Sequence, residues 1–232
     1  MPALVARLSQ NEPLDTRSRG RLIGSLAAGL ASSAKRAGAA AVTSGRWLSE
    51  VVIEVAPQLP IRDLGALREQ YDGLDGDVLA ESLITAATRA TAAVGAAGGA
   101  VAAIEFVAPP ALLTAPVLVA AETLAVVAIE VKLLAELHEV YRRRPQGSAA
   151  QRATAYVLAW ASQRGIDPHQ KAGLTGAVGG ALQRQLRQRL MRRAGRNVTT
   201  YLPFLAGAVA GGELNRRETR RFAEAMLAEL RG

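Results

Sequence analysis

The sequence contains no cysteine, few aromatic residues and no long uncharged run. The absence of cysteine excludes disulfides, thiolate metal sites and a cysteine nucleophile. Aromatic residues make up 4% of the chain, whereas 50% of it is apolar, mostly Ala, Val and Leu. Because aromatic and β-branched residues favour strands and alanine favours helices, this composition predicts helices rather than a sheet.

The uncharged runs are too short for a conventional membrane-spanning helix, which needs roughly 18 to 20 such residues. The longest hold 15 or 16 residues and cover residues 90–104, 106–121 and 197–212. Three carboxylates, Glu105, Glu122 and Glu130, interrupt the apolar segments. A carboxylate at the bilayer centre is costly unless it is paired or lines a cavity. We therefore expect no conventional two-span membrane protein, and we expect these three carboxylates to be buried polar groups.

No catalytic or metal-binding signature is found. The sequence has no Gly-x-Ser-x-Gly elbow, no Walker A lysine and no His-Glu-x-x-His. A di-metal site in a helical bundle needs Glu three residues before His, but Ala135 precedes His138 and Ile166 precedes His169 at that spacing. We therefore expect no metal, no cofactor, no catalytic residue and no enzymatic activity. An enzyme that uses the three buried carboxylates is kept as a third hypothesis, behind the two functions given at the end of this section.

Two long apolar arms, rich in alanine and glycine, lie on either side of Pro109 and Pro110 between residues 84 and 141. A proline pair cannot lie in a helix interior, and the residue before a proline is pushed out of the α region. The segment therefore predicts an antiparallel helical hairpin. Small residues let two helices approach closely. The first arm carries such residues at Gly95, Gly98 and Gly99.

Further helices are expected on both sides of the hairpin. Ser148 is placed to cap a helix that carries Tyr156, Val157 and Trp160 on one side. Asn215, with Glu218 three residues later, has the spacing of a capping box for the last helix. Additional helix-packing glycines lie at Gly176, Gly179, Gly180, Gly207 and Gly211. We expect an all-α fold, a compact multi-helix bundle of roughly eight helices around the Ala/Gly-rich hairpin, with no sheet.

Charge is distributed unevenly along the chain. Residues 1–141 hold 11 basic and 15 acidic residues, whereas residues 142–232 hold 17 basic and 5 acidic residues. Such asymmetry indicates a partner that is a nucleic acid or a membrane surface. The basic residues that we expect to contact a lipid or another anion are Arg142, Arg143 and Arg144, together with Arg184, Arg187, Arg189, Arg192, Arg193 and Arg196.

The arginines at 184–196 allow three interpretations. They form a solvated helix face neutralised by the acidic first half of the chain, or they contact anionic lipid, where each basic group adds about 1 kcal/mol. Nucleic acid is the least favoured partner, because no stacking aromatic residues alternate with these arginines.

Three stretches of the sequence resemble the EcsC family of bacterial proteins. They read AVGAAGGAVAAIEFVAPPALLTAPVLVAAETLAVVAIEVKLLAELHEVY, then RATAYVLAWASQRGID, and then the pair GLTGAVGGALQRQL and LPFLAGAVAGGELNRRETRRFAEAM. The resemblance covers roughly residues 77–230. It implies a helical domain at 77–232 after an N-terminal helical extension at 1–76, in a cytoplasmic protein associated with the inner membrane. The founding member of the family is linked genetically to an ABC transporter, and the family has no established chemistry to transfer.

Two functions are therefore expected from the sequence. The first is a non-enzymatic, membrane-associated helical protein at the inner face of a bacterial membrane. It would bind anionic lipid, an apolar ligand or a membrane partner such as an ABC transporter. The alternative is a soluble helical scaffold whose Ala/Gly faces form a homo-oligomer or a partner interface.

Overall fold

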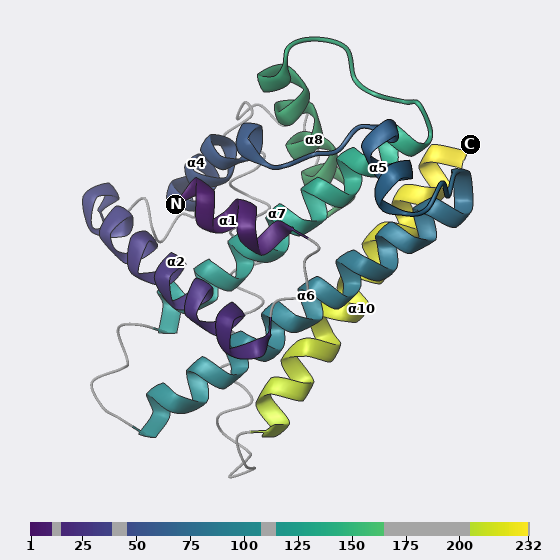
Figure 1. Cartoon of the computed structure of the whole chain (residues 1–232). Helices are drawn as coiled ribbons and strands as arrows, with labels where there is room; N and C mark the ends of the chain where they lie inside the picture. The colour runs from purple at the N-terminus through teal and green to yellow at the C-terminus, as the bar shows by residue number, and fades with distance from the viewer. Residues whose placement is uncertain (11–14, 39–45, 108–114, 165–204, 232) are drawn as a thin grey trace.

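The computed structural model describes residues 1–10, 15–38, 46–107, 115–164 and 205–231 (Figure 1). Within these residues the chain forms eight α-helices and one 3-10 turn, and it contains no strand. The all-α prediction is therefore confirmed. In chain order the elements are α1 (Pro2–Ser9), α2 (Thr16–Ala37), α4 (Arg46–Val55), η1 (Ala56–Gln58), α5 (Leu64–Gln70), α6 (Gly76–Val107), α7 (Ala115–Val140), α8 (Ala149–Gln163) and α10 (Leu205–Arg231).

Helix α7 forms the centre of the bundle. From Leu118 to Val140 its residues are buried, apart from the half-buried Glu122 and His138. A helix that is apolar on every side must be buried by other parts of the protein on every side. Helices α1, α2 and α4 pack against one side of α7, while α6, α8 and α10 cover the others (Figure 1).

The predicted hairpin corresponds to α6 and α7, which run in opposite directions and pack against each other (Figure 1). Residues 108–114, which include Pro109 and Pro110, lie outside the described residues. The most extensive helix–helix packing in the described part of the chain is nevertheless between α6 and α10. The hairpin is therefore only part of the packing around α6, and α10 rather than α7 is the main partner of α6 among the described helices.

Glycine sets the close approach of α6 and α10. A Cβ atom on Gly95 would overlap the carbonyl oxygen of Gly211, and a Cβ on Gly211 would lie 2.8 Å from the carbonyl oxygen of Gly95. A Cβ on Gly212 would lie 3.0 Å from the carbonyl oxygen of Ala92. The two backbones therefore touch directly, as in the small-residue packing of helices.

The capping box predicted at Asn215 and Glu218 is wrong, because α10 runs without a break from Leu205 to Arg231. Asn215 is instead a buried residue in the helix interior. Its side-chain Nδ2 donates a hydrogen bond of 3.1 Å to the carbonyl oxygen of Thr91 on α6. The nearby Gly211 and Gly212 lie inside the same helix and bring α6 within reach of this amide.

The first 76 residues share the core of the remainder. Apolar side chains of α1, α2 and α4 belong to the same buried cluster as those of α6, α7, α8 and α10. The indole Nε1 of Trp47 on α4 donates to Ser33 Oγ on α2 at 3.0 Å, which ties two of the N-terminal helices together. The residue range expected to form an N-terminal extension thus contributes one face of the bundle.

Arg19 on α2 is a buried cation, and two of its nitrogens have no partner in the described part of the chain. The residue is 4% exposed, and neither Nε nor Nη1 forms a hydrogen bond with a described residue. Burial lowers the pKa of its guanidinium from the ordinary value. An uncompensated buried charge opposes folding.

Replacing Arg19 by methionine is therefore expected to raise the free energy of unfolding by about 1–3 kcal/mol, because it removes a buried charge and keeps the volume. Urea unfolding of the purified protein measures the change. Arg17→Met, on the exposed face of the same helix, is the matched control and should change stability by less than about 0.5 kcal/mol. Loss of stability in Arg19→Met would contradict the prediction.

Candidate functional site

Of the three carboxylates that the sequence predicts to be buried, Glu130 is the one described as buried in the structure. It is fully buried on α7 and accepts hydrogen bonds from groups on or beside two other helices. Its Oε2 accepts from Trp160 Nε1 at 2.9 Å, and its Oε1 accepts from Thr219 Oγ1 at 2.9 Å and from Arg164 Nη2 at 2.5 Å. The guanidinium of Arg164 also lies 5.3 Å from the centre of the Phe222 ring.

Both oxygens of Glu130 are occupied by protein donors. A carboxylate held in this way joins α7, α8 and α10 through three hydrogen bonds. Of the other two predicted carboxylates, Glu122 is half-buried rather than buried, and Glu105 lies on α6 with its side chain outside the described residues. The described geometry thus supports a structural role for Glu130.

A second buried ionic cluster fixes the segment before α5 against α7. Glu136 is 2% exposed and accepts two bonds of 2.7 Å from the guanidinium of Arg62 and one of 2.5 Å from Lys132 Nζ. Burial lowers the pKa of Lys132, although the Glu136 carboxylate acts in the opposite direction. Burial also opposes the charge of Arg62, but the hydrogen bonds and charge of Glu136 outweigh it and raise the pKa of Arg62.

The C-terminal end of α7 presents three consecutive exposed arginines, which we call the arginine end: Arg142, Arg143 and Arg144. The helix closes in a Schellman motif, in which Arg143 N–H donates to His138 C=O at 2.8 Å and Arg142 N–H to Glu139 C=O at 3.1 Å. Arg142 occupies the left-handed position of this motif, with φ of 56°. Glycine is the usual residue there, because a Cβ atom destabilises the left-handed conformation.

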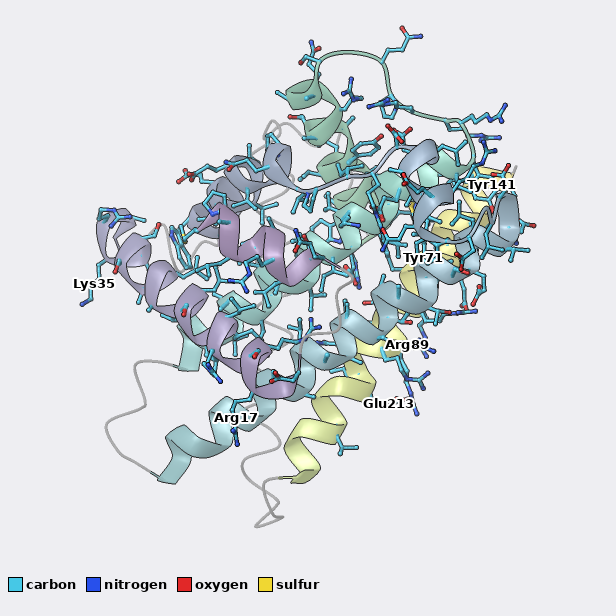
Figure 2. All side chains as sticks on the ribbon, viewed as in Figure 1. Arg17, Lys35, Tyr71, Arg89, Tyr141 and Glu213 are labelled. Carbon is cyan, nitrogen blue, oxygen red and sulfur yellow. The ribbon has the colours of Figure 1, made fainter. Side chains whose placement is uncertain are left out.

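The ends of three helices meet beside the arginine end. Tyr141 donates to Asp77 Oδ1 at 2.5 Å, and Arg231 Nη2 lies 3.1 Å from the same oxygen. These two donors lower the pKa of Asp77, Tyr141 more than Arg231. Figure 1 shows the start of α6, the end of α7 and the end of α10 at one end of the molecule. In Figure 2 Tyr141 marks this end, and Arg17 lies far from it on α2. The arginine end is thus held on a fixed base.

Only two of the three exposed arginine side chains have a hydrogen bond or an ion pair to a described residue. Arg143 Nη1 donates to the carbonyl oxygen of Glu229 at 3.3 Å, and Arg144 Nε lies 3.0 Å from Glu139 Oε1. The side chain of Arg142 has neither. The pKa of Asp75 is lowered mainly by the hydrogen bonds from Arg68 and the Gly76 N–H, and the charge of Arg142 lowers it further. Arg142 is therefore available to an outside anion.

A cavity of about 110 Å³ opens between η1, the end of α7 and the start of α8. We call it the Tyr156 cavity. Its lining includes Pro57, Leu59, Glu139, Arg144, Arg152 and Tyr156. The Tyr156 hydroxyl is buried and has no hydrogen-bond partner among the described residues. A buried hydroxyl without a partner costs roughly 1–3 kcal/mol of stability.

Most of the arginines and several glycines singled out from the sequence lie outside the described residues. On α6 the positions Gly98 and Gly99, and on α10 the position Gly207, belong to described helices, but their surroundings are not described. The residues that fall in undescribed segments are Pro109, Pro110, Gly176, Gly179, Gly180, Arg184, Arg187, Arg189, Arg192, Arg193 and Arg196.

Sequence reasoning missed the charged residues that the structure brings together. Arg62 and Glu136 lie 74 positions apart, so no local spacing relates them. Lys132 and Glu136 did carry a signal in the sequence, because they stand at i and i+4 on an otherwise apolar helix. A Lys–Glu pair is rarely buried unless a third charged group accompanies it, so the spacing pointed to a further charged partner. Tyr156 was expected on one side of its helix with Val157 and Trp160, but the surroundings of its hydroxyl depend on neighbours from other segments.

Comparison of the chain with protein-family models, with curated proteins and with solved structures finds no match. Among the described residues, no group of three His, Asp or Glu side chains could hold a metal ion. No helix in the described ranges is both long enough and apolar enough to cross a membrane.

Proposed function

We propose that this protein is a non-enzymatic, peripheral membrane protein that binds an anionic surface through the arginine end. The surface would be the inner face of a bacterial membrane, and the protein would be cytoplasmic. The resemblance to the EcsC family adds a membrane protein, such as an ABC transporter, as a possible partner at the same face.

The conformation of Arg142 is the observation that carries the proposal. A non-glycine residue in the left-handed region costs roughly 1–2 kcal/mol. Glycine would remove that cost at this helix end, yet the chain places an exposed arginine there, between a tyrosine that is hydrogen-bonded to α6 and a further arginine. Strain that is retained at an exposed, charged position favours a binding role for the side chain.

The distribution of charge gives the proposal independent support. The second part of the chain, residues 142–232, has a net charge of +12 from its Asp, Glu, Lys and Arg residues, and the arginine end is its first segment. Each basic group close to an anionic surface contributes about 1 kcal/mol to binding. The arginines at 184–196 would add to this attraction if they lie on the same side of the molecule as the arginine end. That placement is a proposal from the sequence alone.

The alternative is a soluble scaffold that assembles through its Ala/Gly faces. The contact between Gly95 and Gly211 favours the membrane proposal over this alternative, because those two small-residue faces are occupied by each other inside the chain. Large apolar side chains are also scarce on the described surface, where only Val78 and Val209 are strongly exposed. In the described part of the chain, these two observations thus leave no apolar face against which a second copy could pack.

Flotation with liposomes tests the proposal. The wild-type protein is expected to float with anionic vesicles at low salt, and to be released by high salt or when neutral vesicles are used. Arg142→Gly with Arg143→Gln should reduce binding roughly tenfold or more, because two basic groups are lost. Arg142→Gly alone should weaken binding while raising the free energy of unfolding by about 1 kcal/mol, since glycine relieves the backbone strain.

The control is the pair Arg17→Gln and Arg21→Gln, two exposed arginines on the first turns of α2, whose start lies far from the arginine end (Figure 1). It changes the net charge equally and should leave flotation nearly unchanged. An equal loss of flotation in the control variant would mean that vesicle binding depends only on net charge and not on the arginine end. Binding to neutral vesicles, or binding that resists high salt, would mean that an apolar segment enters the lipid instead.

A further inference from the structure

His138 lies in the last turn of α7, four residues before Arg142. Its carbonyl oxygen accepts the hydrogen bond of 2.8 Å from the Arg143 N–H that closes the helix. Its side chain is half-buried, so the ring is in contact with both the protein and solvent. The sequence has two histidines, and the other, His169, lies outside the described residues. In the described part of the chain, His138 is thus the one histidine, and it belongs to the turn that carries the arginine end.

The ring of His138 is held from two sides. Its Nδ1 lies 2.8 Å from the carbonyl oxygen of Leu134. Because a carbonyl oxygen can only accept, we assign a proton to Nδ1 whether the ring is neutral or charged. The ring also packs edge-on against Tyr156 of α8, with the centroids 5.5 Å apart and the planes inclined at 65°. A second proton must therefore bind at Nε2, and the ring has no need to move when it gains charge.

Charged groups of both signs lie near this ring on α7 and α8. Glu139, the next residue in the chain, is paired with Arg144, with 3.0 Å between Oε1 and Nε. Arg152 on α8 lines the same cavity as Glu139 and Tyr156, and its Nη1 donates to the carbonyl oxygen of Gly147. The carboxylate closest to His138 in the chain thus already has a cationic partner.

The carboxylates contributed to this end by α6, by the turn before it and by α10 each have a donor on another segment. They are Asp75 with Arg68, Asp77 with Tyr141, and Glu229 with Gln163. A charge gained by His138 therefore adds to the charges of the arginine end, since these acidic neighbours are engaged with other groups.

Histidine is the side chain whose charge ordinarily changes between about pH 5 and pH 8, whereas arginine stays charged. A cation at the C-terminal end of a helix is also favoured by the carbonyl groups exposed there. Protonation of His138 thus raises the number of positive side chains at this end from three to four. One further basic group near an anionic surface corresponds to about a fivefold change in Kd.

From this arrangement we propose that His138 is a pH-sensitive switch for the arginine end. Protonation at Nε2 strengthens the attachment of this end to an anionic membrane surface, and deprotonation weakens it. The inference rests on the proposed function and names how that same surface is regulated.

Vesicle binding at about pH 5.5 and about pH 7.5, at equal ionic strength, tests the proposal. With vesicles that contain phosphatidylglycerol, the wild-type protein is expected to bind about three- to fivefold more tightly at the lower pH. His138→Asn should bind equally at both, because an asparagine amide can replace Nδ1 as donor to the carbonyl oxygen of Leu134 but gains no proton. His169→Asn is the control and should keep the pH dependence of the wild type.

An NMR titration of the two histidine rings without vesicles separates the switch from membrane binding. The ring of His138 is expected to change its charge between the two pH values. A ring that does not do so would overturn the switch, whatever the vesicles show. Equal wild-type binding at both pH values, or a pH dependence that persists in His138→Asn, would overturn the switch and leave the proposed function in place. A wild-type protein that binds at neither pH would overturn both.

Discussion

Replacing Gly95 by alanine is expected to lower the free energy of unfolding by about 3 kcal/mol. The new Cβ would overlap the carbonyl oxygen of Gly211 and lie 2.7 Å from Asn215 Nδ2. A backbone carbonyl cannot rotate away as a side chain can, so α6 and α10 must separate. Their separation also stretches the hydrogen bond between Asn215 and the carbonyl oxygen of Thr91.

Urea or thermal unfolding of a small series of glycine variants checks this expectation. Gly211→Ala and Gly212→Ala should cost progressively less, because their Cβ atoms would lie 2.8 Å and 3.0 Å from the facing carbonyl oxygens. Gly24→Ala on α2 is the matched control. A Cβ atom added there would have no described residue of another segment within 4 Å, so alanine should stabilise the protein by roughly 0.5–1 kcal/mol through its higher helix propensity. Equal effects at Gly24 and Gly95 would contradict the direct backbone contact.

Glu130→Gln is expected to lower the free energy of unfolding by about 3 kcal/mol. The amide nitrogen that replaces one carboxylate oxygen would face a donor, either Trp160 Nε1 or the groups of Arg164 and Thr219. The change also leaves the guanidinium of Arg164 without its counter-charge. Arg164 is 21% exposed, so water reduces part of that loss, and we take the lower end of the range for broken buried pairs.

Glu81→Gln is the control for charge removal, because Glu81 pairs with Arg220 on the surface with both side chains 40–50% exposed. It should cost less than about 1 kcal/mol. The double variant Glu130→Leu with Arg164→Met should recover most of the stability, since it removes both charges together. A Glu130→Gln protein that is as stable as the wild type would show that this carboxylate is not needed for the fold, and would reopen a catalytic role for it.

Local sequence patterns predicted the helices well and their partners poorly. Ser148 was expected to cap a helix, and it does so in a capping box with Gln151. Tyr156, Val157 and Trp160 were expected on one face and are all buried. These features depend on residues within a few positions of each other, which a single sequence displays directly.

Contacts between distant segments could not be predicted in this way. Asn215 has the residue type and spacing of a helix cap, but 124 positions separate it from Thr91, whose carbonyl oxygen it binds. The same holds for the candidate site, where η1, α7 and α8 together line the Tyr156 cavity. A periodic pattern shows that a helix has a buried face, but it does not show which helix covers that face.

The packing of α6 against α10 also has a consequence for the order in which the newly made chain can assemble. About a hundred residues separate the end of α6 from the start of α10. At a synthesis rate of about 5–20 residues per second, the glycine face of α6 waits roughly 5–20 s for its partner. Thr219, which completes the bonds of Glu130, arrives with the same helix. The nascent protein therefore closes its core only when its last helix has been made.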